Sequence, residues 1–183
     1  MAPANFAELI QKIQSGQISG TAAKTVFKVM FEKGGEPENI VQDLGLPQVS
    51  DEAAIAVAIE KVIGYKGTVN GGVYQFSVPR AETVSEGGMN VPPSMGTANA
   101  LNFQPTGGGK AAITGDFVLL GSEVNPILKT LREHGIEVTA LHSHMIDDSP
   151  HLFFMHFWAN DDAERLARAL RGALDLANLK RGS

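Results

Sequence analysis

The chain carries four of its five histidines in one short stretch, ALHSHMIDDSPHLFFMHFWAN. His142 and His144 are two residues apart, and residues at that spacing in a β-strand face the same side. A turn centred on Ser149 places His156 directly opposite His142, with the Cβ atoms about 4.5–5.5 Å apart, and puts Phe154 opposite His144. The sequence therefore predicts a hairpin on which three imidazoles share one face.

Three imidazoles on one face are a ligand set for a divalent metal ion. Zinc in catalytic sites commonly takes three protein ligands and leaves one position open. The predicted face also carries Val138, Ala140, Leu152 and Trp158, so the site should be partly dry. The other interpretation is a hairpin whose histidines make only ordinary hydrogen bonds. Because three of the five histidines gather on this face, the pattern favours a metal site, with zinc as the first candidate.

Polar residues elsewhere in the chain can complete this site. Glu123 opens a predicted helix near the end of a strand that should neighbour the hairpin. It can serve as a fourth ligand or general base, or it can simply be an acid favoured by the helix dipole. Arg80 can bind a substrate carboxylate or phosphate through its guanidinium fork, or form a surface ion pair. Asp116 can orient a ligand histidine from outside the ligand set.

The remaining two histidines have other predicted roles. His134 lies in the last turn of a predicted helix, where a cation is favoured, and is interpreted as structural. His151 lies in the turn of the hairpin and is predicted to be exposed to solvent. Asp147 and Asp148 are predicted to shape the same turn.

The elements that position these residues fall into two parts. Residues 1–64 show helical spacing of apolar side chains throughout, as in FAELIQKI, TAAKTVFKVMFEKGG and EAAIAVAIEKVI. After Gly64 apolar residues alternate, and the turn signals Asn70-Gly71-Gly72 and Gly107-Gly108-Gly109 predict two hairpins. Residues 81–95, rich in Gly, Pro and Ser, are predicted to form a loop.

Two helices complete the second part, one predicted to be capped by Ser122 and the other by Asn160. Strands are predicted on both sides of the first helix, including the histidine hairpin. The sequence thus predicts an α+β fold. It consists of a small helical module over residues 1–64 and an antiparallel-sheet domain with two helices over residues 65–183.

Composition narrows the function classes. A net charge of −5 argues against nucleic acid as the main partner, because phosphate binding needs a basic surface. The chain has no cysteine, so a metal must be held by His, Asp, Glu or backbone oxygen. The N-terminus lacks the basic start and apolar run of a signal peptide, and no apolar stretch reaches the ~20 residues of a membrane span. We therefore expect a soluble, cytoplasmic protein.

The second half resembles the LppY/LpqO family, a domain found in mycobacterial lipoproteins and many other bacterial proteins. The matching stretches are GGVYQFSVPR, ITGDFVLLGSEVNPILKTLREHGIEVTALHSHM and LFFMHFWA. Members of this family are often exported, and the resemblance implies no specific activity. Because Glu123 lies in the family motif EVNP, the resemblance makes it the first choice for the fourth ligand or general base.

The first half resembles the helical tail domain shared by the B subunit of tRNA-dependent amidotransferases and the YqeY proteins. The matching run is GQISGTAAKTVFKVMFEKGGEPENIVQDLGLPQVSD. In the amidotransferase this domain helps to engage tRNA. Residues 1–64, however, hold five lysines, no arginine and eight acidic residues, and only the first part of the tail is present. A helical packing or oligomerisation module is therefore expected.

Three functions remain open at this point. The first is a metal-dependent enzyme, a hydrolase or lyase acting on a small oxygen-rich molecule, in which Glu123 moves protons and Arg80 holds an anionic group. The second is a non-catalytic module that binds a metal or a small ligand. The third is an interaction protein that docks, or forms a homo-oligomer, through its helical half. An open metal beside an acid favours the first function, and a closed four-ligand site favours the second.

Overall fold

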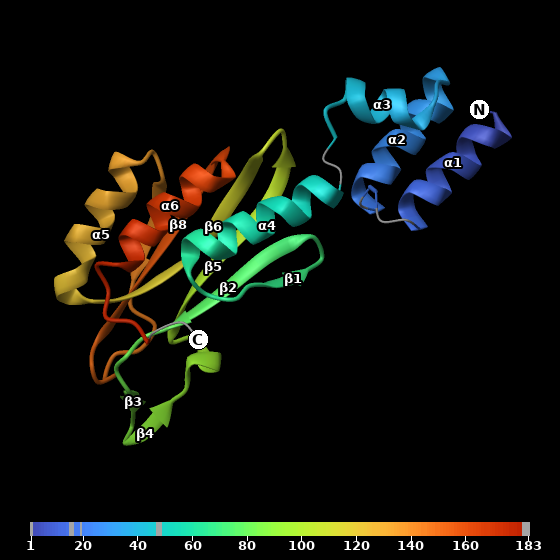
Figure 1. The fold of residues 1–183 in the computed structure, drawn as a ribbon. Helices are drawn as coiled ribbons and strands as arrows, with labels where there is room; N and C mark the ends of the chain where they lie inside the picture. Colours follow the sequence, from blue (N-terminus) through green and yellow to red (C-terminus); the bar gives the residue numbers. More distant parts are fainter. Residues whose placement is uncertain (1, 15–16, 19, 47–48, 181–183) are drawn as a thin grey trace.

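The computed structural model describes residues 2–14, 17–18, 20–46 and 49–180, with only the backbone described at residues 20–21 and 49–54. The helices in these residues are α1 (Pro3–Gln14), α2 (Gly20–Lys33), α3 (Pro37–Asp43), α4 (Val49–Ile63), α5 (Gly121–Glu133), α6 (Ala163–Leu174) and the short 3-10 helix η1 (Pro93–Met95). The strands are β1 (Thr68–Asn70), β2 (Val73–Pro79), β3 (Val84–Glu86), β4 (Met89–Val91), β5 (Ala98–Gly107), β6 (Lys110–Leu120), β7 (Glu137–His142) and β8 (Leu152–Asp162). Figure 1 shows their arrangement.

Six strands form one antiparallel sheet in the order β1-β2-β5-β6-β8-β7, and β3 pairs with β4 separately. The predicted hairpins are confirmed, because β1 leads into β2 and β5 into β6. At the first turn Gly71 and Gly72 have φ angles of 59° and 84°, a left-handed conformation that glycine adopts without strain. Strand β7 lies at the edge of the sheet, so the histidine hairpin has one open side.

One face of the sheet is covered by α4, α5 and α6 (Figure 1). Alternate residues of β8 point into this layer, so Met155 and Phe157 are fully buried. Ile59 and Ile63 of α4 and Leu170 of α6 belong to the same apolar core. This core fixes the sheet from behind and leaves its other face to carry polar side chains.

The opposite face of the sheet is covered only at one end. There Val84 and Val91 of the β3–β4 hairpin pack against Val118, Leu152 and Phe154. Away from this small cluster the same face carries exposed side chains on β5, β6 and β8. The sheet thus has a closed helical side and a largely open polar side.

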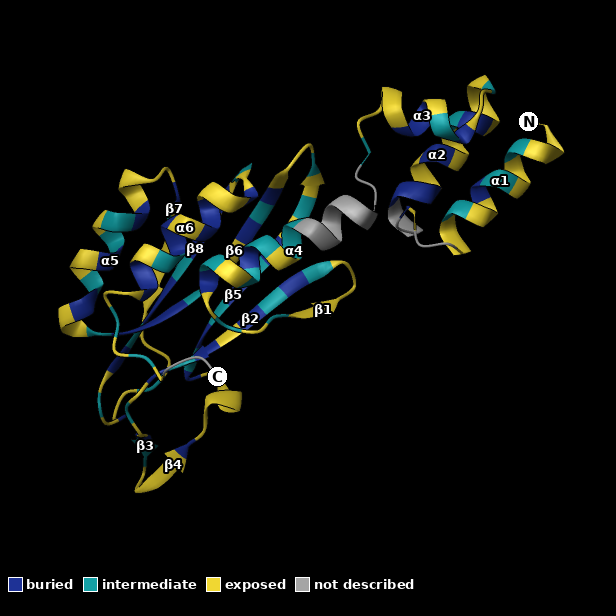
Figure 2. Ribbon diagram, in the orientation of Figure 1, coloured by how far each residue is buried: buried dark blue, intermediate teal, exposed yellow. Residues whose placement is uncertain are grey.

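Helices α1, α2 and α3 have an apolar cluster of their own. It is formed by buried residues, among them Leu9, Val26, Met30, Ile40 and Val41. In Figure 2 the buried positions of these three helices face one another. The cluster contains no residue of the sheet.

The predicted α+β fold, with a helical region before an antiparallel sheet, is confirmed. The predicted loop over residues 81–95 is wrong, because β3, β4 and η1 form there. The predicted caps are also displaced. Helix α5 begins at Gly121 after Leu120, and α6 is capped by the side chain of Asp162, which accepts a hydrogen bond from the main-chain N–H of Arg165. Among the described residues no helix is long and apolar enough to cross a membrane.

Candidate metal centre

The histidine hairpin is formed by β7 and β8, but its register differs from the predicted one by two residues. His142 pairs with Phe154, and His156 pairs with Ala140. A shift by an even number of residues keeps each side chain on its face, so the imidazoles still converge. A β-bulge between Val138 and Ala140 turns Val138 toward Phe157 and the helical core, so its predicted place on the histidine face is wrong.

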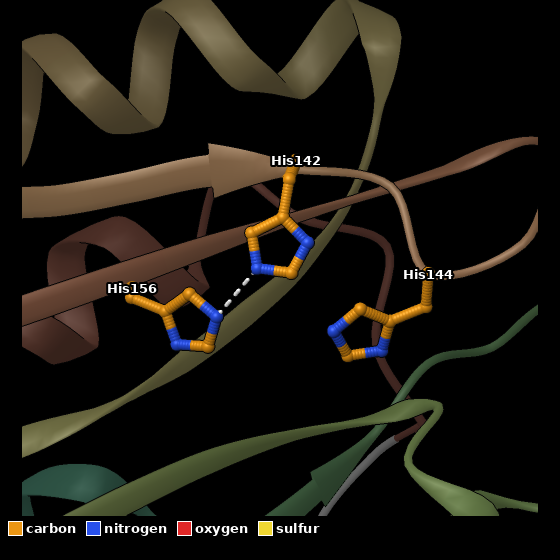
Figure 3. A group of neighbouring side chains, drawn as sticks. All are labelled: His142, His144 and His156. Carbon is orange, nitrogen blue, oxygen red and sulfur yellow. Dashed lines mark hydrogen bonds between the residues drawn. The ribbon is translucent and has the colours of Figure 1, made fainter.

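The three imidazoles come from the end of β7, the loop that follows it and the middle of β8 (Figure 3). One nitrogen of each of His142, His144 and His156 lies within 4.8 Å of the other two. The Nε2 atoms of His142 and His156 are 2.8 Å apart and share a hydrogen bond. The ring centroid of His142 is 5.0 Å from that of each of the other two rings. Three ligand atoms are therefore gathered around one point.

His156 is oriented by Asp116 on the neighbouring strand. The two residues are direct partners in the pairing of β6 with β8, and the Asp116 carboxylate contacts Nδ1 of His156. A carboxylate at Nδ1 holds the proton on that nitrogen and leaves Nε2 as the ligand atom. Nε2 is the atom that faces His142. The predicted role of Asp116 as an orienting residue matches this geometry.

His144 is held by an aromatic ring, although it lies outside the strand. Its imidazole stacks on Phe154 with ring centroids 3.5 Å apart and an angle of 12° between the planes. Phe154 is itself 3% exposed, within the cluster under the β3–β4 hairpin. Burial of this ring face, together with the nearby His142, lowers the pKa of His144 from 6.5. A lowered pKa favours the neutral imidazole that a metal requires.

The site is open to solvent on its other sides. The side chain of His156 is 35% exposed, and His142 and His144 are exposed. Leu152 is buried, as a partly dry site requires, but Trp158 is 47% exposed at the opposite end of the face. The predicted dryness therefore applies to the end near Phe154 only. A metal held here would have room for a ligand from solution.

Glu123 has its own set of partners away from the imidazole cluster. Its carboxylate accepts hydrogen bonds from the main-chain N–H groups of Leu120 (2.7 Å) and Asn178 (3.0 Å). Two further hydrogen bonds come from the guanidinium of Arg80, at 2.7 and 3.1 Å. The group of mutually close ligand atoms consists of the three histidines and does not include Glu123. Its role as fourth ligand or general base stays a prediction.

Arg80 is buried, with 2% of its surface exposed, and every part of its guanidinium is engaged. Besides Glu123 it donates to Glu82 at 3.0 Å and to the main-chain oxygen of Val118 at 2.7 Å. Burial lowers the pKa of Arg80, but the hydrogen bonds and charges of Glu123 and Glu82 outweigh it, so the pKa is raised above its usual value. Its predicted role in binding a substrate anion stays a prediction, and the contacts favour a structural ion pair for both residues.

The other two histidines differ from one another. His134 ends α5, and its Nδ1 lies 2.8 Å from the main-chain oxygen of Thr130, which fits the predicted structural role. The side chain of His151 is 46% exposed, as expected for the turn, but its Nδ1 lies 2.6 Å from the Asp148 carboxylate. The two residues are three positions apart in the chain, and the roles predicted for them do not include this contact.

Two family models match different parts of the chain. A model described as Domain of Unknown Function (DUF1259) matches residues 57–176. A model described as GatB domain matches residues 1–69. The two matches overlap over the end of α4 and the start of the sheet.

The first part is also similar to the B subunit of the aspartyl/glutamyl-tRNA(Asn/Gln) amidotransferase of several Rickettsia species. Identity is 49% over 63 residues in Rickettsia canadensis, covering 34% of this chain and 13% of the relative. In Rickettsia bellii it is 44% over 75 residues, covering 37% of this chain and 16% of the relative. The chain thus spans a small fraction of the length of these relatives. No solved structure matches the chain.

Proposed function

The chain belongs to the family described as Domain of Unknown Function (DUF1259), and we propose that its three histidines bind a divalent metal ion, with zinc as the best candidate. One observation carries the proposal: three imidazole nitrogens from separate positions lie within 4.8 Å of one another. Ordinary hydrogen bonding does not require that convergence. Nitrogen donors without thiolates suit zinc well.

The spacing of the ligand atoms fits such an ion after a small adjustment. Zinc–nitrogen bonds of about 2.0–2.1 Å in tetrahedral geometry separate two ligand nitrogens by ~3.3 Å. The Nε2 atoms of His142 and His156 are 2.8 Å apart, so the rings need to move apart by a fraction of an ångström. One of these nitrogens must also give up the hydrogen that they share. Metal binding should therefore release a proton or shift the tautomer of His142.

The chemistry that follows depends on the open coordination position. A bound zinc would polarise a carbonyl oxygen or lower the pKa of a bound water. Asp116 would keep Nε2 of His156 free for the ion, and Phe154 would hold the ring of His144 in place. We propose a metal-dependent hydrolase or lyase acting on a small oxygen-rich molecule. The exposed histidine face supports this, because a substrate can reach it from solution.

Two alternative functions use other features of the chain or need no catalysis. A non-catalytic module that binds metal or a small ligand would use the same three histidines, and the resemblance of the second half to the LppY/LpqO family is compatible with it. An interaction protein would use the helical half, where Phe6, Phe27 and Phe31 form a row of rings with centroids 5.8 and 6.3 Å apart. Phe31 is 73% exposed at the end of this row. A homo-oligomer formed through these helices is part of this second alternative.

Calorimetric titration of zinc into the metal-stripped full chain tests the proposal. The protein should be purified without a metal-affinity step, and its metal content should be measured before stripping. We expect binding of one zinc ion per chain, with loss of binding in a His142→Ala, His156→Ala double variant. His134→Ala is the matched control, because this histidine lies at the end of α5 outside the cluster. Equal affinity in the double variant and the control would reject the site.

A further inference from the structure

A second group of polar side chains lies in the loop between β7 and β8, and the metal centre does not use it. Nδ1 of His151 is 2.6 Å from Oδ1 of Asp148. Nε2 of the same ring is 3.2 Å from Oγ of Ser143. The three residues form one chain of contacts that runs from a carboxylate through an imidazole to a hydroxyl.

We propose that Ser143, His151 and Asp148 form a nucleophilic site for acyl transfer from small neutral esters. A serine hydroxyl is a weak nucleophile until a base accepts its proton, and a base that is oriented by a third group does this best. The two contacts here lie within the ~2.6–3.2 Å reach that such a relay needs. Ser143 lies between the proposed ligands His142 and His144, but none of the three relay residues belongs to the imidazole cluster, so the relay itself does not require the metal.

The positions of the ring nitrogens match the required roles. Asp148 contacts Nδ1, so that nitrogen carries the hydrogen and Nε2 is left as the proton acceptor. The Asp148 side chain is 2% exposed, whereas that of His151 is 46% exposed. The carboxylate is thus shielded, and the base and Ser143 remain accessible from solution. The same division between a buried acid and an accessible hydroxyl is found in serine hydrolases.

The loop that carries the relay is anchored at several points. Ser149 exchanges two main-chain hydrogen bonds of 2.9 Å with Ser85 on β3. Met145 packs against the apolar cluster under the β3–β4 hairpin. The second oxygen of Asp148 accepts the main-chain N–H of Leu152 at 3.0 Å, where β8 begins. These anchors hold the acid and the base in position before a substrate arrives.

The surroundings indicate the class of substrate. Asp147 is exposed next to Asp148, so the local charge disfavours anionic acyl donors. The rings of Phe153 and His151 are nearly perpendicular, with centroids 5.1 Å apart. The main-chain N–H of His144, the residue after the hydroxyl, donates no hydrogen bond to any residue that the structure describes. In α/β-hydrolases the main-chain N–H of the residue after the nucleophile is one of the oxyanion donors.

The reaction consumes only the ester and one water molecule. Oγ of Ser143 attacks the ester carbonyl carbon, and its proton passes to Nε2 of His151. The carbon–oxygen bond to the alcohol then breaks, and the alcohol leaves with that proton. Water attacks the acyl-serine with His151 accepting its proton, the acid is released, and the proton returns to Oγ of Ser143.

Covalent labelling with diisopropyl fluorophosphate tests the proposal on the full chain. Peptide mass spectrometry should locate the phosphoryl group on Ser143 after fluoride leaves. Labelling is the decisive measurement because free imidazoles also hydrolyse activated esters such as 4-nitrophenyl acetate. The experiment should be run both on chelator-treated and on zinc-loaded protein. An adduct in both samples would support the relay even if the proposed metal site failed.

Three variants make the outcome specific. Ser143→Ala should abolish the adduct, and His151→Gln should slow labelling by ~10²–10⁴-fold, the usual contribution of a general base. Ser149→Ala is the matched control, since it removes a hydroxyl from the same loop outside the relay. Far-ultraviolet circular dichroism and thermal unfolding should show that each variant is folded. No adduct on Ser143, or labelling of equal rate in His151→Gln, would overturn the proposal.

Discussion

Replacement of Glu123 by glutamine tests whether this carboxylate stabilises the fold or serves the metal. Its two oxygens accept four hydrogen bonds, two from Arg80 and one each from the main-chain N–H of Leu120 and of Asn178. Glu123 and Arg80 are only 8% and 2% exposed. Glutamine keeps the size of the side chain but removes its charge. It also points an NH₂ group at donors that need an acceptor.

The expected loss of stability follows from these contacts. Removing one partner of a buried ion pair costs about 3–5 kcal/mol, because the other charge stays buried. Arg80 keeps Glu82 at 3.0 Å, and the Glu82 side chain is 22% exposed. We therefore expect the lower end of the range, ~3 kcal/mol. An acid that only favoured the start of the helix would contribute ~0.3–1 kcal/mol, so the two roles are separable.

Urea unfolding of the metal-stripped protein measures the free energy of unfolding of the variant and of the wild type, from the transition midpoint and the slope of the free energy against urea concentration. Glu133→Gln is the matched control on the same helix. Its side chain is 60% exposed and pairs with Lys129 at 3.8 Å, so its loss should change the free energy of unfolding by less than ~0.5 kcal/mol. Zinc content should be measured for both variants and should be the same as in the wild type.

Two results would refute this reasoning. Loss of zinc from Glu123→Gln with an unchanged free energy of unfolding would identify Glu123 as a metal ligand. A destabilisation no larger than that of the control would show that the buried ion pair contributes little. In the second case the contacts of Arg80 would need another explanation, and binding of a substrate anion would become the better one.

Four further predictions concern the imidazole cluster, Asp116 and the helical core. Asp116→Asn should weaken zinc binding by about 10–100-fold in calorimetry while the protein stays folded, because the orientation of His156 is lost; unchanged affinity would count against this role. Zinc binding should weaken as the pH falls below ~6.5, since ligand imidazoles must be neutral. Because the pKa of His144 is lowered in the folded protein, its imidazole binds a proton more readily in the unfolded state than in the folded state. The metal-free protein should therefore lose stability as the pH falls through that range, and an NMR titration placing the His144 pKa at 6.5 or above would contradict this. Met30→Ala should cost ~2–5 kcal/mol of stability in the cluster of α1–α3 and leave zinc affinity unchanged; a parallel loss of zinc affinity would show that the cluster supports the metal centre.

The convergence of the histidines could be predicted from sequence because it depends only on the parity of the strands. His142 and His156 keep their common face whether the register is the predicted one or differs by two residues. The register itself could not be predicted. The loop of residues 143–151 is longer than a tight turn, and its shape depends on the contact between Ser149 and Ser85. The bulge near Val138, where this side chain packs against the helical core, is not indicated by any local pattern either.

The orientation of Glu123 could not be predicted for a different reason. Its place near the start of a helix and close to the end of β6 is the predicted one, but its orientation depends on residues distant in the chain. Arg80 approaches it from just after β2, and Asn178 from the segment after α6. A buried arginine must find carboxylates, and Glu123 is within its reach. Burial of Arg80, which the sequence does not reveal, therefore decides the orientation of the Glu123 carboxylate.

We propose that the chain consists of two parts, and helix α4 indicates where one part ends and the other begins. The sequence places the boundary near residue 64, where helical periodicity ends. In the structure Ile59 and Ile63 of α4 lie in the core beneath the sheet, whereas the apolar cluster of α1–α3 is separate. The family match to the sheet region also begins at residue 57, inside α4. These observations favour a boundary between α3 and α4. Helix α4 lies within the match to the GatB domain, but it would then complete the core of the sheet domain. This explains why the two family matches overlap.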